Sequence, residues 1–97
     1  MKGNILRGKV LRLLGDLYPA GIEETGMVGI YYQYDKVDDI ICAAAYLCDK
    51  GLVRKTQTPH PYKKQQDITC YKITARGIDL LEGTIPAEAG ISVPREG

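Results

Sequence analysis

The segment 35–53, with the sequence DKVDDIICAAAYLCDKGLV, constrains the fold of this chain more than any other. Apolar residues recur in it at intervals of three and four, the spacing of a helix with one buried face. Gly51 can take a positive φ at the end of such a helix, and Leu52 can fold back on its last turn. The segment therefore predicts a helix with its N-cap at Asp35 that leads directly into a β-strand.

On a helical wheel, this predicted helix divides into an apolar and an acidic side. The side expected to be buried comprises Val37, Ile40, Ile41, Ala44, Leu47 and Cys48. The side expected to face outward comprises Asp35, Asp38, Asp39, Cys42, Tyr46 and Asp49. The alanine run 43–45 allows close approach by another helix, as in a compact helix-turn-helix pair.

Two further helices are expected before this segment. Residues 4–17 have the apolar spacing of an amphipathic helix. That helix should stop before Tyr18-Pro19, because the residue preceding a proline is pushed out of the α region. Residues 22–34 predict a short helix, although VGIYYQY also has strand propensity and Gly26 and Gly29 interrupt it.

A β-hairpin is expected after the segment. Residues 52–58 and 68–73 predict two strands, with Tyr71 and Ile73 favoured as the buried face of the second. The loop between them contains two prolines, which exclude it from a central strand. A long and basic hairpin loop results.

The end of the chain predicts one more helix and then an extended tail. Thr74 is the expected N-cap of a helix at 75–81. Beyond it, residues 84–97 contain two prolines and no helical period. The end of this tail should be mobile unless Ile85 and Ile91 dock on a surface.

The order helix, helix, helix, hairpin, helix resembles that of winged helix-turn-helix domains, including the MarR-like and PadR-like regulators. Two phrases carry the resemblance, YLCDKGLV at 46–53 and YKITARG at 71–77. The matching positions are Leu47, Gly51, Leu52, Val53, Tyr71, Ile73, Thr74 and Gly77. The resemblance implies an α+β fold with three helices, a two-stranded β-hairpin wing and a short C-terminal helix. It places a winged helix domain at 1–83 and an extended tail at 84–97.

The phrase LLEGTIPAEAGI at 80–91 is similar to the end of small winged-helix-like proteins of Mu-like phages and prophages. This second resemblance implies a phage accessory or regulatory protein. Winged helices also serve as protein-protein modules, so the fold alone does not choose between DNA and protein partners.

Composition narrows the class of protein. At 97 residues with 44% apolar and 26% charged residues, the chain is expected to form one globular domain. No run approaches the roughly 18 apolar residues of a membrane span, and the N-terminus lacks a signal-peptide pattern, so we expect a cytoplasmic protein. Three cysteines without a CxxC spacing predict buried or half-buried free thiols.

The sequence predicts no enzyme. His60 is the sole histidine and is expected to be a solvated loop residue between two prolines. Asp38 and Asp39 are adjacent on a helix, where side chains point about 100° apart and do not form a carboxylate pair. There is no phosphate-binding glycine pattern. We therefore expect no catalytic site, cofactor, metal ion or small-molecule substrate.

Positive charge is concentrated in two places although the net charge is only +1. Residues 51–77 carry +5 and residues 1–18 carry +3, while the remaining segments are acidic. Lysine and arginine attract DNA phosphates, which makes double-stranded DNA the expected partner. The predicted contacts are Lys36, Tyr46, Arg54, Lys55, His60, Tyr62, Lys63, Lys64 and Arg76, with support from Lys2, Arg7, Lys9 and Arg12 on the first helix.

In a winged helix domain, the helix that begins at Asp35 would be the recognition helix, which enters the major groove of DNA. Its acidic outer face opposes this docking. Its groove-facing positions are expected to be Asp38, Asp39, Cys42 and Tyr46. Carboxylates repel phosphate, and an aspartate can accept a hydrogen bond only from cytosine. The alternative is a protein-interaction module, acting as a homodimer or with another protein, that uses this acidic, Tyr46-bearing face.

Overall fold

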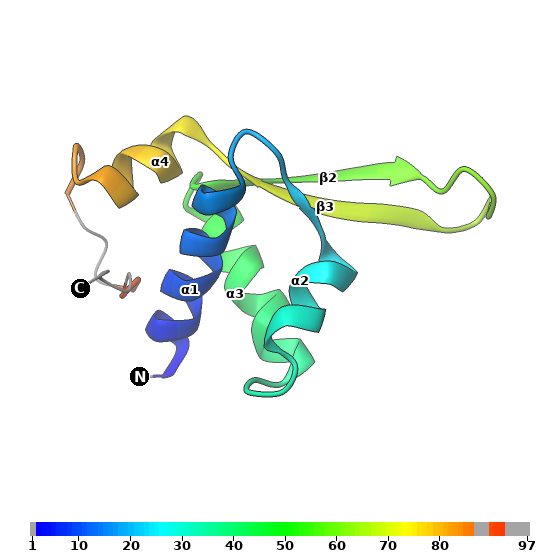
Figure 1. Cartoon of the computed structure of the whole chain (residues 1–97), viewed down its shortest axis with the longest axis horizontal. Helices are drawn as coiled ribbons and strands as arrows, with labels where there is room; N and C mark the ends of the chain where they lie inside the picture. The colour runs from blue at the N-terminus through cyan, green and yellow to red at the C-terminus, as the bar shows by residue number, and fades with distance from the viewer. Residues whose placement is uncertain (1, 87–89, 93–97) are drawn as a thin grey trace.

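The computed structural model describes residues 2–86 and 90–92. Within them the chain is an α+β arrangement of helices and a three-stranded antiparallel sheet (Figure 1). The elements are α1 (Lys2–Leu17), β1 (Ile22–Glu23), α2 (Glu24–Tyr31), α3 (Val37–Asp49), β2 (Val53–Pro59), β3 (Asp67–Ile73) and α4 (Ala75–Glu82). The strand order is β1-β3-β2, which leaves β2 at an edge and is compatible with a winged-helix-like layout.

The core lies where α1, α3 and the inner face of the sheet meet. Ala43 and Ala44 are 4% and 0% exposed on the side of α3 that is buried, and such small side chains permit close packing by a second helix. Burial of each large apolar side chain contributes about 1.5–3 kcal/mol. The buried set is Leu6, Val10, Leu11, Leu14, Met27, Ile40, Ala43, Ala44, Leu47, Leu52, Val53, Tyr71, Ile73, Leu80 and Ile91.

The exit of α3 confirms the expected glycine-terminated helix. Gly51 has φ of 74°. The Leu52 amide donates to the Leu47 carbonyl at 3.0 Å, and the Gly51 amide donates to the Cys48 carbonyl at 3.0 Å. Together these bonds form a Schellman motif, which turns the chain from α3 into β2.

The start of α4 is fastened to this exit through Thr74. Its hydroxyl accepts from the Gly77 amide at 3.2 Å, which confirms the predicted N-cap. The same hydroxyl donates to the Gly51 carbonyl at 2.7 Å, and the Thr74 amide donates to the Leu52 carbonyl at 3.0 Å. A Cβ at Gly77 would meet the Leu52 carbonyl oxygen and the Ile73 side chain, so Gly77 allows α4 to lie directly on the turn.

The short helix predicted at 22–34 is present as α2, but it spans only Glu24–Tyr31 and follows the strand β1, whose Ile22 pairs with Tyr71 of β3. A second prediction for the region before α3 is wrong. Asp35 is not the N-cap of α3, since Lys36 occupies that position without a side-chain cap bond. The reason is that the Asp35 amide still bonds to the Tyr31 carbonyl at 2.9 Å, so this residue closes the turn after α2 instead of opening α3.

The hairpin and the tail follow the predictions more closely. Tyr71 and Ile73 are 1% and 2% exposed, which confirms the buried face of β3. Of the predicted tail, residues 87–89 and 93–97 lie outside the described residues. Ile85 is half-buried and Ile91 is 6% exposed, so both isoleucines pack on the core. No helix in the described part of the chain has the length and apolar character needed to cross a membrane.

Tyr71 links the sheet to the first turn of α2. Its hydroxyl donates to Glu24 Oε2 at 2.6 Å. Burial, and then the hydrogen bond to Glu24, raise the pKa of Tyr71 above its ordinary value of 10.0. The folded chain therefore retains this proton at a pH where the unfolded chain has released it.

We expect the free energy of unfolding to fall as the pH rises above about 10, because the unfolded state then binds fewer protons than the folded state. Tyr71→Phe removes the hydrogen bond to Glu24. It should flatten this pH dependence and lower the free energy of unfolding at neutral pH by about 1–2 kcal/mol. Urea unfolding at neutral and alkaline pH measures both effects. Tyr18→Phe, at a side chain that is 52% exposed, is the control and should keep the wild-type pH dependence. Equal pH dependence in Tyr71→Phe and wild type would contradict this account.

Candidate nucleic-acid interface

The hairpin of β2 and β3, residues 53–73, forms a ribbon that projects from the helices, and we refer to it as the wing (Figure 1). Every residue of β2 after Val53 is exposed. The two strands pair from Val53 opposite Ile73 at the core to Pro59 opposite Asp67 near the tip. Pro59 is accommodated because β2 is an edge strand.

The charge of the wing is strongly positive. It contains Arg54, Lys55, Lys63, Lys64 and Lys72, all exposed, and its single acidic residue is Asp67. Arg54 and Lys72 are register partners directly opposite each other on the two strands. Like charges in this position destabilise a hairpin, and a bound anion relieves their repulsion. Lys72 was not among the predicted contacts, because only the hairpin register places it opposite Arg54.

The tip of the wing is ordered by His60. Its Nδ1 accepts from the amides of Tyr62 at 3.1 Å and Lys63 at 3.2 Å. The His60 amide donates to the Gln66 carbonyl at 2.9 Å. His60 thus lies in the loop, as expected, but it is half-buried and its side chain holds the loop that presents Lys63 and Lys64. Tyr62 is 90% exposed at the same tip and its ring lies edge-on to that of His60.

The free face of α3 differs from the predicted one by a rotation about the helix axis. Val37, expected inside, is 47% exposed. Tyr46, expected outside, is half-buried, and the Arg7 guanidinium carbon lies 3.7 Å from the centre of its ring. The exposed residues of α3 are Val37, Asp38, Asp39, Cys42, Ala45 and Asp49. The side chains on this face are mostly acidic or small. The Tyr46 ring points toward α1 instead of outward.

The cations of α1 are largely used within the fold. Besides covering Tyr46, Arg7 donates from Nη1 to the Gly90 carbonyl at 3.3 Å. Arg12 Nε lies 3.5 Å from Asp16 Oδ1. Lys9 is exposed, while the side chain of Lys2 lies outside the description. Helix α1 therefore offers fewer available charges than its sequence suggests.

Lys36 and Arg76 complete the set of predicted contacts, and the structure separates both from the wing tip. Lys36 is exposed at the start of α3. Arg76 is exposed at the start of α4 beside Gly51. The structure thus groups Arg54, Lys55, His60, Tyr62, Lys63 and Lys64 on the wing and places Lys36, Tyr46 and Arg76 elsewhere.

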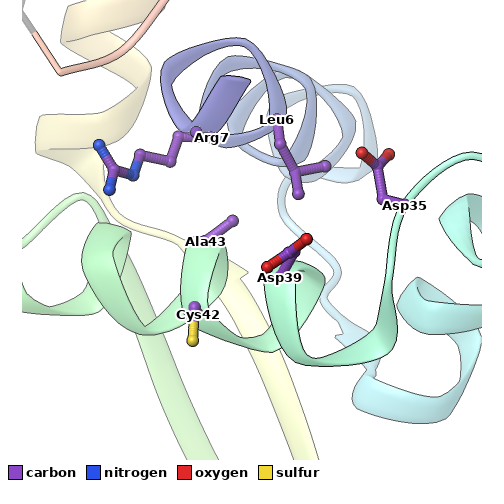
Figure 2. A pocket seen from close by; sticks show the side chains of 7 residues that line it. Leu6, Arg7, Asp35, Asp39, Cys42 and Ala43 are labelled. Carbon is purple, nitrogen blue, oxygen red and sulfur yellow. The ribbon is translucent and has the colours of Figure 1, made fainter. Parts of the chain in front are cut away.

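A pocket of about 250 Å³ lies between α1 and α3 (Figure 2). Arg7 and Leu6 line it from α1, Asp39 and Ala43 line it from α3, and Asp35 enters from the preceding turn. Asp35 Oδ2 is buried without a hydrogen-bond partner. Asp39 is exposed, as predicted, and its side chain lies at this pocket.

Reactive groups are dispersed in the described residues. Three or more His, Cys, Asp or Glu side chains do not gather there in a metal-binding group. Cys42, Cys48 and Cys70 are free thiols. Cys42 is exposed, contrary to the expectation that all three would be at least half-buried. Burial raises the pKa of Cys48, which disfavours the thiolate form that a nucleophile needs.

The contact of Tyr46 with Arg7 predicts a structural role for this side chain. Tyr46→Ala should remove the partner of the Arg7 guanidinium and loosen the segment 90–92, whose Ser92 amide bonds to the Asn4 carbonyl at 2.9 Å. We expect a loss of about 1–2 kcal/mol in unfolding free energy and faster hydrogen exchange at Ser92. Tyr34→Ala, at a side chain that is 80% exposed, is the control. Unchanged exchange at Ser92 in Tyr46→Ala would show that the tyrosine does not secure this segment.

Comparisons with known proteins do not identify the chain. No protein-family model, curated protein or solved structure matches it.

Proposed function

We propose that this chain is a cytoplasmic, non-enzymatic winged-helix protein that binds double-stranded DNA through the phosphate contacts of its wing. In this proposal it acts as a transcriptional regulator or as an accessory protein of a phage or prophage. Support for the fold comes from the helix-rich first half, the glycine-terminated α3 and the hairpin that follows it. The phage association rests on the similarity of the phrase at 80–91 alone.

The like-charge pair Arg54 and Lys72 is the observation that most favours an anionic partner. Two cations that face each other across a hairpin repel each other and destabilise it, whereas nearby DNA phosphates offset this repulsion. Lys63 and Lys64 add positive charge at the tip of the wing. A long and narrow basic ribbon suits a polyanion better than a compact ligand.

The same geometry makes the proposed binding tolerant of sequence. Sequence readout in the major groove requires donors and acceptors on the inserted element. The exposed polar side chains of α3 are Asp38, Asp39, Cys42 and Asp49, with no lysine or arginine among them. Phosphate contacts position a protein on the duplex but carry no sequence information. We therefore expect similar affinity for duplexes of unrelated sequence.

Fluorescence anisotropy with a labelled mixed-sequence duplex tests this proposal. If the wing engages three to five phosphates, the plot of log affinity against log salt between about 50 and 200 mM should have a slope of about −3 to −4.5. A second duplex of unrelated sequence should give the same slope and an affinity within about threefold. Absence of binding at about 50 mM salt would contradict the proposal.

A protein-interaction role is the second candidate, and one observation favours it. Ile30, Tyr32, Tyr34 and Val37 are all exposed around the turn between α2 and α3. Exposed aromatic side chains such as Tyr32 and Tyr34 are enriched at protein interfaces. This surface differs from the Tyr46 face first expected to carry such a role, because the Tyr46 ring is covered by Arg7.

A further inference from the structure

The two faces of the wing differ at its base. Side chains of successive residues in a strand point to opposite faces of the sheet. Val53, Tyr71 and Ile73, which are 3%, 1% and 2% exposed, define the face that packs on the helices. Arg54 and Lys72 occupy the alternate positions and point to the opposite face, which we refer to as the outer face.

A hollow of about 410 Å³ lies on the outer face of the sheet. Arg54 and Thr56 line it from β2, and Cys70 and Lys72 line it from β3. Glu23 of β1, the register partner of Cys70, lines it from the other side. Small-ligand pockets have volumes of roughly 300–1,000 Å³, so this hollow has room for a phosphate group and the sugar attached to it.

Two cations meet at this hollow. The Cβ atoms of directly opposed residues in an antiparallel pair are about 4.5–5.5 Å apart, so the charged ends of Arg54 and Lys72 can reach the same anion. Thr56 adds a hydroxyl that can donate a hydrogen bond to it. Among the described residues, no carboxylate forms an ion pair with Arg54 or Lys72. Their charges therefore remain available for an external anion.

Lys55 lies on the helix side of the sheet. It is the register partner of Tyr71, which is buried. Burial raises the pKa of Cys48 on α3, and the charge of Lys55 opposes this increase, so Lys55 lies near α3. Because α3 carries exposed aspartates, a duplex on the helix side would approach carboxylates. The outer face is turned away from them.

We propose that the hollow on the outer face is the binding site of one DNA backbone phosphate, held jointly by Arg54 and Lys72. Thr56 donates a hydrogen bond to the same phosphate. The duplex then passes over the outer face of the wing, away from the acidic α3. Glu23 at the edge of the hollow repels the phosphate and weakens its binding. The phosphate site rests on the DNA binding proposed above and defines which face of the wing carries it.

Fluorescence anisotropy with two neighbouring variants tests which face binds. Arg54→Ala should lower the affinity for a mixed-sequence duplex at least about fivefold at about 50 mM salt. Lys55→Ala is the matched control, because it removes the same charge from the next position of the same strand. It should lower the affinity less than about twofold.

The salt dependence tests whether one phosphate is shared. Arg54→Ala with Lys72→Ala should make the log–log salt slope shallower by about 1, whereas cations on separate phosphates would change it by about 2. This double variant should be at least as stable to urea as wild type, because it removes a like-charge pair. Weaker DNA binding in it is therefore not explained by unfolding.

Glu23→Gln tests the hollow from its third strand. Removing this carboxylate should raise the affinity for duplex DNA at least about threefold at about 50 mM salt. Glu82→Gln, at an exposed residue of α4, makes the same change of charge away from the hollow. It should alter the affinity less than about twofold.

Three outcomes overturn the phosphate site while wild type still binds DNA, so that the proposed function stands. The first is a Lys55→Ala variant weakened as much as Arg54→Ala, which moves the duplex off the outer face. The second is a slope change of about 2 in the double variant, which assigns the two cations to separate phosphates. The third is a Glu23→Gln variant that binds no better than Glu82→Gln. Wild type that does not bind at about 50 mM salt contradicts the proposed function, and the phosphate site with it.

Discussion

Replacing Gly77 with alanine is expected to lower the free energy of unfolding by about 2–3 kcal/mol, a large effect for so small a change. The added Cβ would meet the Leu52 carbonyl oxygen and the side chain of Ile73. The carbonyl cannot move away easily, because it accepts the Thr74 amide at 3.0 Å. Overpacking against backbone should therefore exceed the gain of about 1 kcal/mol that alanine brings in helix propensity.

Gly29→Ala is the matched control for Gly77→Ala. Gly29 also lies in a helix, but a Cβ there has no atom within 4 Å. Helix propensity alone then acts, and we expect stabilisation by about 0.5–1 kcal/mol. Urea unfolding of both variants measures whether each substitution lowers or raises the free energy of unfolding. A Gly77→Ala variant as stable as wild type would show that α4 does not pack closely on the exit of α3.

The second large effect is expected for DNA binding. Lys63→Glu with Lys64→Glu replaces two positive charges at the wing tip with negative ones. We expect the affinity for duplex DNA to fall on the order of 100-fold at about 50 mM salt, and the log–log salt slope to become shallower by about 2. Anisotropy titration over a salt series measures both quantities. The unfolding free energy should change little, because both side chains are exposed.

Single substitutions at Lys64 and Lys9 provide a control with equal change of charge. Lys64→Glu should weaken binding about tenfold or more and reduce the salt slope by about 1. Lys9→Glu, on α1 and away from the wing, should change affinity by less than about threefold. Equal losses in the two variants would mean that the net charge of the chain, and not the wing, sets the affinity.

Features that depend on nearby residues were predictable from the sequence. The Schellman exit at Gly51 and the N-cap at Thr74 are each encoded within a few positions, and both are confirmed. The buried face of β3 followed from the chemistry of Tyr71 and Ile73. These are short-range signals, in which one residue type satisfies one backbone requirement.

Features that depend on distant residues were not predictable in the same way. β1 has only two residues and exists because Ile22 and Glu23 pair with Tyr71 and Cys70 of β3. No local periodicity marks so short a strand. Likewise, a helical wheel of α3 alone cannot show that Arg7 of α1 covers Tyr46. This contact changes which side chains of α3 are exposed.

The candidate interface was predicted in outline and corrected in detail. Charge counting located the basic hairpin, and its lysines are exposed as expected. The structural role of His60 depends on the loop geometry that brings its Nδ1 to two backbone amides. The pairing of Lys72 with Arg54 depends on strand register. Neither follows from residue type alone.

The central claim is that the wing, and not α3, forms the main contact with DNA. Amide chemical-shift mapping by NMR during titration with a short duplex tests it most directly. The account predicts that shifts at low salt concentrate between Arg54 and Lys72, with the outward residues of α3 from Asp38 to Asp49 little changed. Shifts concentrated on α3 with the wing tip unaffected would contradict it, as would a spectrum that does not change at all.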